Sequence, residues 1–193
     1  MKLHVEVSKI KCNRTTAELS KDEVYGALTF FSGTKVDGDF VPDKRTKKIY
    51  VTDVQTGVKG GDIWKPTPNR FTFDLGETDH FGLQFSLYEK DNAKAYEKLR
   101  AQSQVEEADF GTLLSKIPFP TSMTSAATAS VPLVETVINL YNFLRNDDMI
   151  GSEPFAYHID DPKLEMGKSF KFKRLFANYD IVLNFELERK VQN

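Results

Sequence analysis

The sequence has one cysteine, three histidines and no long apolar run in its 193 residues, and each shortage excludes a class of protein or site. A single cysteine, Cys12, cannot form an intramolecular disulfide or a cysteine-based zinc cluster. No stretch of about 18 consecutive apolar residues occurs, so the sequence predicts no transmembrane helix. His4, His80 and His158 are scattered and lack the i, i+4 partner of a metal motif, so we expect structural or surface roles for them.

An excess of charge of one sign is also missing. The chain carries 26 basic and 28 acidic residues, a net charge of −2, so it has no overall field that would attract nucleic acid or an anionic membrane. We therefore expect no nucleic-acid partner, and any membrane binding has to be local. The first residues contain neither an apolar core nor a cleavage site of a signal peptide. A cytoplasmic location is the expectation, with export by a route that reads no N-terminal signal left open.

Alternation of apolar and polar residues at both ends of the chain predicts β-strands. The first alternation covers residues 3–12 and slips in phase near Ser8 and Lys9, as a β-bulge would cause. Residues 24–31 are apolar on both faces, which is typical of an internal strand. Further short strands are expected at residues 49–54, 71–73, 83–87, 155–157, 170–172 and 179–187.

The middle of the chain has a different composition. Residues 92–116 are rich in good helix formers, and Asp91 before them is of the residue type that caps a helix N-terminus. Prolines end this predicted helix, and an amphipathic second helix is expected over residues 132–145. We predict one domain, 1–193: a mostly β, antiparallel β-sandwich of about eight strands with a two-helix insertion at 92–146.

Three short stretches resemble the calcium-loop region of C2 domains, which are eight-stranded antiparallel sandwiches. Ser20–Tyr25 has an Asp just before a strand that contains a Tyr. Leu83–Asp91 is an apolar strand that ends in two carboxylates one residue apart, and Asn146–Gly151 has an Asp followed by two apolar residues and Gly. If the helical block is an insertion in that loop, the resemblance places four residues at the metal-ligand positions of the family: Asp22, Glu89, Asp91 and Asp148.

Calcium is the candidate metal of this resemblance, because Ca²⁺ takes six to eight oxygen ligands and carboxylates supply them. The sequence departs from the family in having Glu89 where Asp is usual and Thr16 about where a further Asp is expected. Turn and capping chemistry alone account for the same carboxylates, with Asp91 as a helix N-cap and 146–148 as a turn. Calcium binding is therefore one of two interpretations of these residues.

Two further features predict lipid or partner contacts. A basic run contains Lys44, Arg45, Lys47 and Lys48, and we expect it to form a patch with the basic residues of 168–174 on adjacent strands, facing phospholipid headgroups. A solubilising outer face is the alternative. Met149 and Ile150 lie at the predicted loop end, where membrane-docking C2 domains place apolar residues.

The expected function is a noncatalytic binding module that engages an anionic phospholipid surface or a protein partner. No motif pairs a nucleophile with a base, so we do not expect an enzyme, although a hydrolase with an unrecognised site stays a third hypothesis. The main alternative is a component of a secreted or injected toxin or effector assembly, in which the sandwich is the docking scaffold and the helices are the active element.

Overall fold

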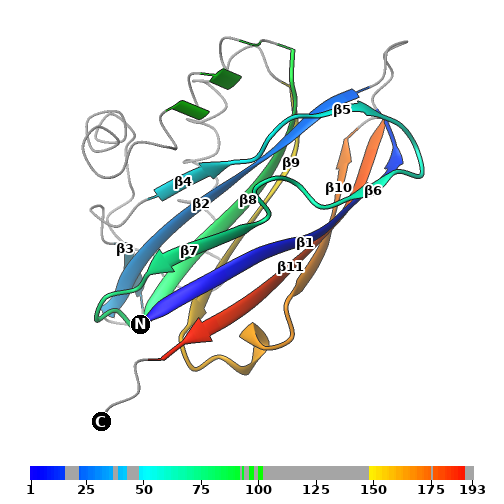
Figure 1. The fold of residues 1–193 in the computed structure, drawn as a ribbon. Coiled ribbons are helices and arrows are strands. Elements are labelled where there is room, and N and C mark those ends of the chain that lie inside the picture. Colours follow the sequence, from blue (N-terminus) through cyan, green and yellow to red (C-terminus); the bar gives the residue numbers. More distant parts are fainter. Residues whose placement is uncertain are drawn as a thin grey trace.

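The computed structural model describes residues 1–15, 22–36, 39–42, 48–91, 93, 96, 97, 100, 101, 148–174 and 176–189. These residues form eleven antiparallel strands and one short 3₁₀ helix, Pro162–Leu164, and include α-helical positions at 93, 96, 97, 100 and 101 (Figure 1). The strands are β1 Lys2–Arg14, β2 Asp22–Val36, β3 Asp39–Pro42, β4 Lys48–Val51, β5 Gln55–Val58, β6 Ile63–Trp64, β7 Arg70–Asp74, β8 His80–Glu89, β9 Asp148–His158, β10 Lys168–Arg174 and β11 Ala177–Glu188. None of the described helical segments is long and apolar enough to cross a membrane.

The strands form two sheets. One has the order β10-β11-β1-β6, with β7 also paired to β1, and the other has the order β3-β2-β8-β9, with β4 and β5 also paired to β2. Because β6 and β7 pair with different parts of β1, and β3, β4 and β5 with different parts of β2, each sheet has four strand positions. This architecture of two antiparallel sheets fits the predicted sandwich.

The alternation read from the sequence explains which residues face inward. In β1, Leu3, Val5 and Val7 are fully buried, and the register with β11 shifts between Val7 and Lys9, which confirms the predicted bulge. Strand β2 lies between β8 and the shorter strands and is buried on both faces, as predicted. Each fully buried Leu, Val or Phe side chain contributes about 1.5–3 kcal/mol relative to exposure, so the continuous inward rows favour this pairing over a slipped one.

Aromatic rings join the two sheets across the core. Phe30 of β2 stacks on Phe73 of β7 with a centroid distance of 4.2 Å. At the other edge, the ring of Phe155 in β9 lies 5.8 Å from that of Phe185 in β11. Offset and edge-to-face pairs of this kind add about 0.5–1.5 kcal/mol to the free energy gained by burial.

A second, smaller cluster lies on the opposite face of the β2–β8 sheet. It contains Tyr25, stacked on Tyr88 at 5.3 Å, together with Tyr96, whose hydroxyl donates to the carbonyl of Thr52 at 3.0 Å. The described positions between Ala93 and Ala101 are α-helical. Of these positions, Tyr96 packs on the outer face of this sheet.

The remainder of the predicted two-helix insertion, 92–146, lies outside the described residues. The strands on either side of it, β8 and β9, are antiparallel neighbours, and Glu89 pairs with Asp148. The chain leaves the six-stranded sheet after β8 and returns to the same end of that sheet at β9. This is the end to which the predicted calcium ligands belong.

Candidate functional site

The backbone brings all four predicted metal ligands to one end of the six-stranded sheet. Glu89 of β8 pairs with Val24 of β2 on one side and with Asp148 of β9 on the other. The N–H of Lys90 donates to the carbonyl of Glu23 at 2.7 Å, which continues the β2–β8 pairing by one residue. Asp22 and Asp91 follow at the next position of the two strands. We call this region, defined by Asp22, Glu89, Asp91 and Asp148, the carboxylate end.

Asp22 is held in a buried hydrogen bond between the sheets. The hydroxyl of Tyr179 in β11 donates to Oδ2 of Asp22 at 2.8 Å, and the exposed fraction of Asp22 is 1%. Burial and the hydrogen bond to Asp22 both raise the pKa of Tyr179, so the phenol keeps its proton and stays a donor. A carboxylate fixed by such an outer hydrogen bond is oriented in the way that ligating carboxylates usually are.

Cys12 lies beside this hydrogen bond, paired with Tyr179 across β1 and β11. The thiol is fully buried, and burial raises its pKa above the ordinary value. A protonated, enclosed thiol is a poor nucleophile. Cys12 is therefore a buried and poorly reactive thiol.

The other carboxylates of this end differ in exposure. Glu89 is 6% exposed and continues the inward row of β8, whereas Asp91 lies beyond the strand and is exposed. Glu23, between Asp22 and Val24, forms an ion pair with Lys90 at 3.3 Å. The end therefore combines buried and solvent-facing oxygen donors, which are the donor type that Ca²⁺ prefers.

The two apolar residues predicted at the loop end have different surroundings. Ile150 is buried in the main core cluster, so it is not available at the surface. Met149 is half-buried and packs against the cluster around Tyr25, and its carbonyl accepts a hydrogen bond from Arg174 at 2.8 Å. That hydrogen bond ties the start of β9 to the end of β10 in the other sheet.

Of the basic run in the predicted patch, the structure describes only Lys48. Lys44, Arg45 and Lys47 lie outside the described residues. Lys48 is exposed at the start of β4 and pairs with Phe30, away from the first residue of β2. Strand β4 pairs with β2, whereas β10 is an edge strand of the other sheet next to β9. The expectation that β4 and β10 are adjacent is therefore wrong. Both strands are basic in sequence, but they lie in different sheets and pair with different neighbours.

An exposed aromatic at the carboxylate end was missed by sequence reasoning. Phe176, in the turn between β10 and β11, is 48% exposed, and the guanidinium carbon of Arg14 lies 5.6 Å from its ring centroid. Lys173 and Arg174 before the turn are also exposed. The available signal was an aromatic two residues after Arg174 and between two alternating stretches, which is a hairpin-turn position.

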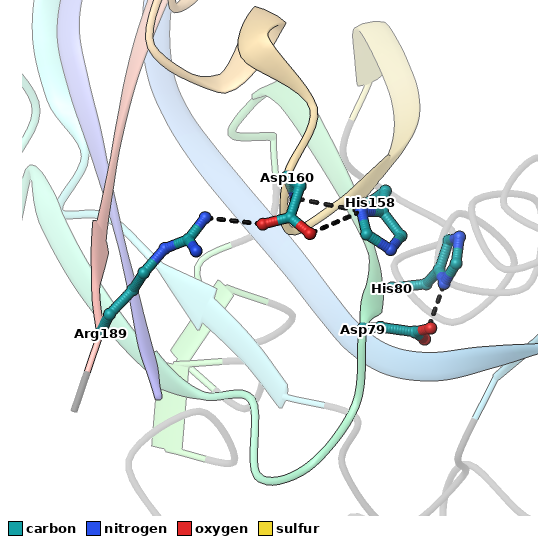
Figure 2. A network of polar contacts seen from close by, with 5 residues as sticks. All are labelled: Asp79, His80, His158, Asp160 and Arg189. Carbon is teal, nitrogen blue, oxygen red and sulfur yellow. Dashed lines mark hydrogen bonds and ion pairs between the residues drawn. The ribbon is translucent and has the colours of Figure 1, made fainter. Parts of the chain in front are cut away.

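A second group of polar residues gathers at the opposite end of β8. His80 pairs with His158 across β8 and β9, and their ring centroids lie 4.7 Å apart at 78° (Figure 2). Nδ1 of His80 is 2.7 Å from Oδ1 of Asp79, and the N–H of Asp160 donates to Nδ1 of His158 at 3.1 Å. The sequence-based view of these histidines as isolated is corrected, because the partner of each lies on a neighbouring strand far along the chain.

Comparisons with known proteins give structural neighbours only. No protein-family model and no curated protein sequence matches the chain. A C2 domain of plant extended synaptotagmin 1 is matched at 11% identity and a TM-score of 0.45, over 98% of this chain and 96% of that one. One of the other solved structures is human GIVD cytosolic phospholipase A2, in complex with an inhibitor and terbium chloride. It is matched at 14% identity and a TM-score of 0.44, over 96% of this chain.

A third match, named for CC2D1B, has 11% identity and a TM-score of 0.41, over 96% of this chain and 54% of that one. The chain spans only 17% of the length of the phospholipase chain. These likenesses concern architecture, and nothing about activity or ligands is taken from them.

Proposed function

We propose that this domain is a noncatalytic binding module that docks on anionic phospholipid surfaces through its carboxylate end. The observation that carries the proposal is Phe176: a large apolar side chain, half exposed, next to Arg14 and preceded by exposed Lys173 and Arg174. An aromatic ring with adjacent cations suits the headgroup level of a membrane. Each such cation contributes about 1 kcal/mol near an anionic surface.

A bound calcium ion would explain why carboxylates lie at the same end as the exposed ring and its cations. Without a cation, the negative charges of Asp22, Glu89, Asp91 and Asp148 oppose approach to an anionic membrane. The residues that would hold Ca²⁺ are these four, and the ion would supply the positive charge that removes this repulsion. Their all-oxygen character and the buried hydrogen bond that orients Asp22 fit such an ion.

Vesicle co-sedimentation tests the docking proposal. The full chain is mixed with phosphatidylcholine vesicles with and without phosphatidylserine, in calcium or in a chelator. Phe176→Ala is expected to weaken binding to the phosphatidylserine vesicles about tenfold, the effect of losing roughly half of the burial free energy of one Phe. Met166→Ala is the matched control, because Met166 is 84% exposed and precedes β10 rather than following it.

No binding by the unaltered chain, or an equal loss in the Met166 variant, would contradict docking through this end. In that case a protein partner replaces the membrane as the explanation of the exposed ring. The calcium part is tested separately with Asp91→Asn, which should raise the calcium concentration needed for half-maximal binding. Glu77→Gln removes an exposed carboxylate from the turn before β8 and should leave that concentration unchanged.

The alternative function as part of a toxin or effector assembly assigns the active role to the helical block. Nearly all of that block lies outside the described residues, so no observation favours it. The docking proposal uses only residues that the structure describes, apart from the side chain of Asp148.

A further inference from the structure

The end of the sandwich opposite the carboxylate end has a different set of donor atoms. Asp79 and His80 lie at the start of β8, and His158 is the last residue of β9. The N–H of Ile159 donates to the carbonyl of Asp79 at 2.8 Å, which extends the pairing of the two strands beyond the histidines. The backbone under all three side chains is therefore held by the sheet, and the two imidazoles project side by side (Figure 2).

The spacing of these side chains is close to that of a metal site. One ligand atom from each of Asp79, His80 and His158 lies within 4.8 Å of the other two. Nitrogen and oxygen atoms that share a tetrahedral Zn²⁺ at about 2.0–2.1 Å are about 3.3–3.4 Å apart. Small side-chain rotations close this difference, and the exposed fractions of the side chains, 17% for His80 and 41% for His158, leave room for them and for entry of an ion.

The hydrogen bonds determine which ring nitrogens carry protons. The Asp79 carboxylate can only accept, so Nδ1 of His80 is the donor and the lone pair of the neutral ring is on Nε2. Nδ1 of His80 and Oδ1 of Asp79 already face one another at 2.7 Å, so an ion that both residues share takes the place of the proton between them, with Nδ1 as the ligand atom of His80.

The ring of His158 has the opposite tautomer to that of His80. The backbone N–H of Asp160 can only donate, so Nδ1 of His158 is the acceptor and is unprotonated. Oδ2 of Asp160 lies 3.7 Å from the same nitrogen, and Arg189 at the end of β11 holds the other oxygen of that carboxylate at 2.7 Å. For Nε2 of His158 to bind an ion, its proton has to move to Nδ1; the ring then gives up the hydrogen bond from the Asp160 N–H, and the Asp160 carboxylate, now 3.7 Å away, lies on the side of the new Nδ1 proton.

We propose that Asp79, His80 and His158 form a binding site for a divalent transition-metal ion of the Zn²⁺ class. Two imidazoles and one carboxylate suit zinc, cobalt or nickel, whereas Ca²⁺ and Mg²⁺ prefer sites made wholly of oxygen. Three protein ligands leave further positions of the ion for water or for a group of a binding partner. The site is independent of the carboxylate end, which lies at the other terminus of β8.

Titration of the full chain, prepared without a histidine tag, with Zn²⁺ and with Co²⁺ tests the proposal. One equivalent of Co²⁺ is expected to bind and to give visible d–d absorption, and Zn²⁺ should displace it and raise the melting temperature. His158→Asn and His80→Gln should each weaken binding at least tenfold. His4→Gln is the matched control, because His4 bonds to Thr72 and Glu188 in the other sheet, and it should bind Co²⁺ as the unaltered chain does.

A thermal melt in the presence of a chelator shows whether each variant is folded. The test of the site needs only one of the two variants, His158→Asn or His80→Gln, to be folded. Absence of saturable Co²⁺ and Zn²⁺ binding by the unaltered chain would overturn the proposal. Full binding by a folded His158→Asn or His80→Gln chain would also overturn it. Loss of binding in His4→Gln alone would move the metal to a different site and refute this one.

Discussion

Tyr179 and Asp22 form a polar contact within an otherwise apolar region between the sheets. The contact is 2.8 Å long, and both side chains are buried. A buried acceptor that loses its donor costs about 1–3 kcal/mol, because the desolvation of the carboxylate is no longer compensated. The hydrogen bond therefore supports both the stability of the sandwich and the orientation of the first predicted metal ligand.

Tyr179→Phe is expected to lower the free energy of unfolding by about 1–3 kcal/mol, since it removes one hydrogen-bond donor to the buried carboxylate of Asp22. Urea denaturation, read at the midpoint with an unchanged slope, measures this loss. Tyr157→Phe is the control, because the Tyr157 hydroxyl forms no hydrogen bond within the described part of the chain, and its effect should be within about 0.5 kcal/mol. Equal effects of the two substitutions would contradict the importance of the Asp22 contact.

Residue-level sequence reasoning found the carboxylates but missed their partners. Asp22 was identified from a local motif, whereas Tyr179 lies 157 positions away and is brought to it by sheet packing. His80 and His158 were similarly treated as isolated, because their proximity arises from the register of β8 and β9. The spacing of residues along the sequence predicts which side chains are neighbours within one helix or strand. It does not predict which residues pair across two strands.

At the level of elements, glycine allows the two sheets to approach closely at one edge. Gly151 in β9 faces Phe172 of β10, and a Cβ at Gly151 would fall 2.6 Å from the Cβ of Phe172. The ring of Phe172 is buried and stacks on Phe85 at 6.5 Å. A methyl group at Gly151 therefore has to displace a core aromatic.

Gly151→Ala is expected to destabilise the fold by about 1–3 kcal/mol, as overpacking of a core does. Gly60→Ala is the matched control, since its nearest contact would be the carbonyl oxygen of Asn13 at 3.4 Å. That variant should unfold near the midpoint of the unaltered chain. Thermal and urea unfolding of both variants measure this difference. Equal stability of Gly151→Ala and Gly60→Ala would refute the close approach of the two sheets at Gly151.

The long strands were predictable because their apolar residues alternate over many positions. Strand β11, with Ile181 and Leu183 inward, and β1 with its bulge follow from the pattern alone. The short strands β3, β5 and β6 could not be predicted, because two to four residues carry no clear period and their pairing depends on a long neighbour. The positions of β4 and β10 also depend on the strands with which they pair. For this reason their shared basic composition wrongly suggested that they are adjacent.

At the level of the whole molecule, the sandwich has two ends with different donor chemistry. The carboxylate end offers oxygen, and the end with Asp79, His80 and His158 offers two imidazoles. Strand β8, of 10 residues, links the two ends and spans roughly 30 Å at about 3.3 Å per residue. Sites this far apart act independently, so stabilisation by calcium at one end and by zinc at the other is expected to add.

The most direct test of docking through the carboxylate end is a fluorescence measurement with a reporter at each of two positions. Buried Cys12, with its raised pKa, reacts slowly, so a polarity-sensitive dye can be attached selectively to Phe176→Cys or to Met166→Cys. With calcium and phosphatidylserine vesicles, the dye at position 176 is expected to shift its emission to the blue and the dye at 166 to stay unchanged. No shift at 176, or an equal shift at both positions, would contradict docking through this end.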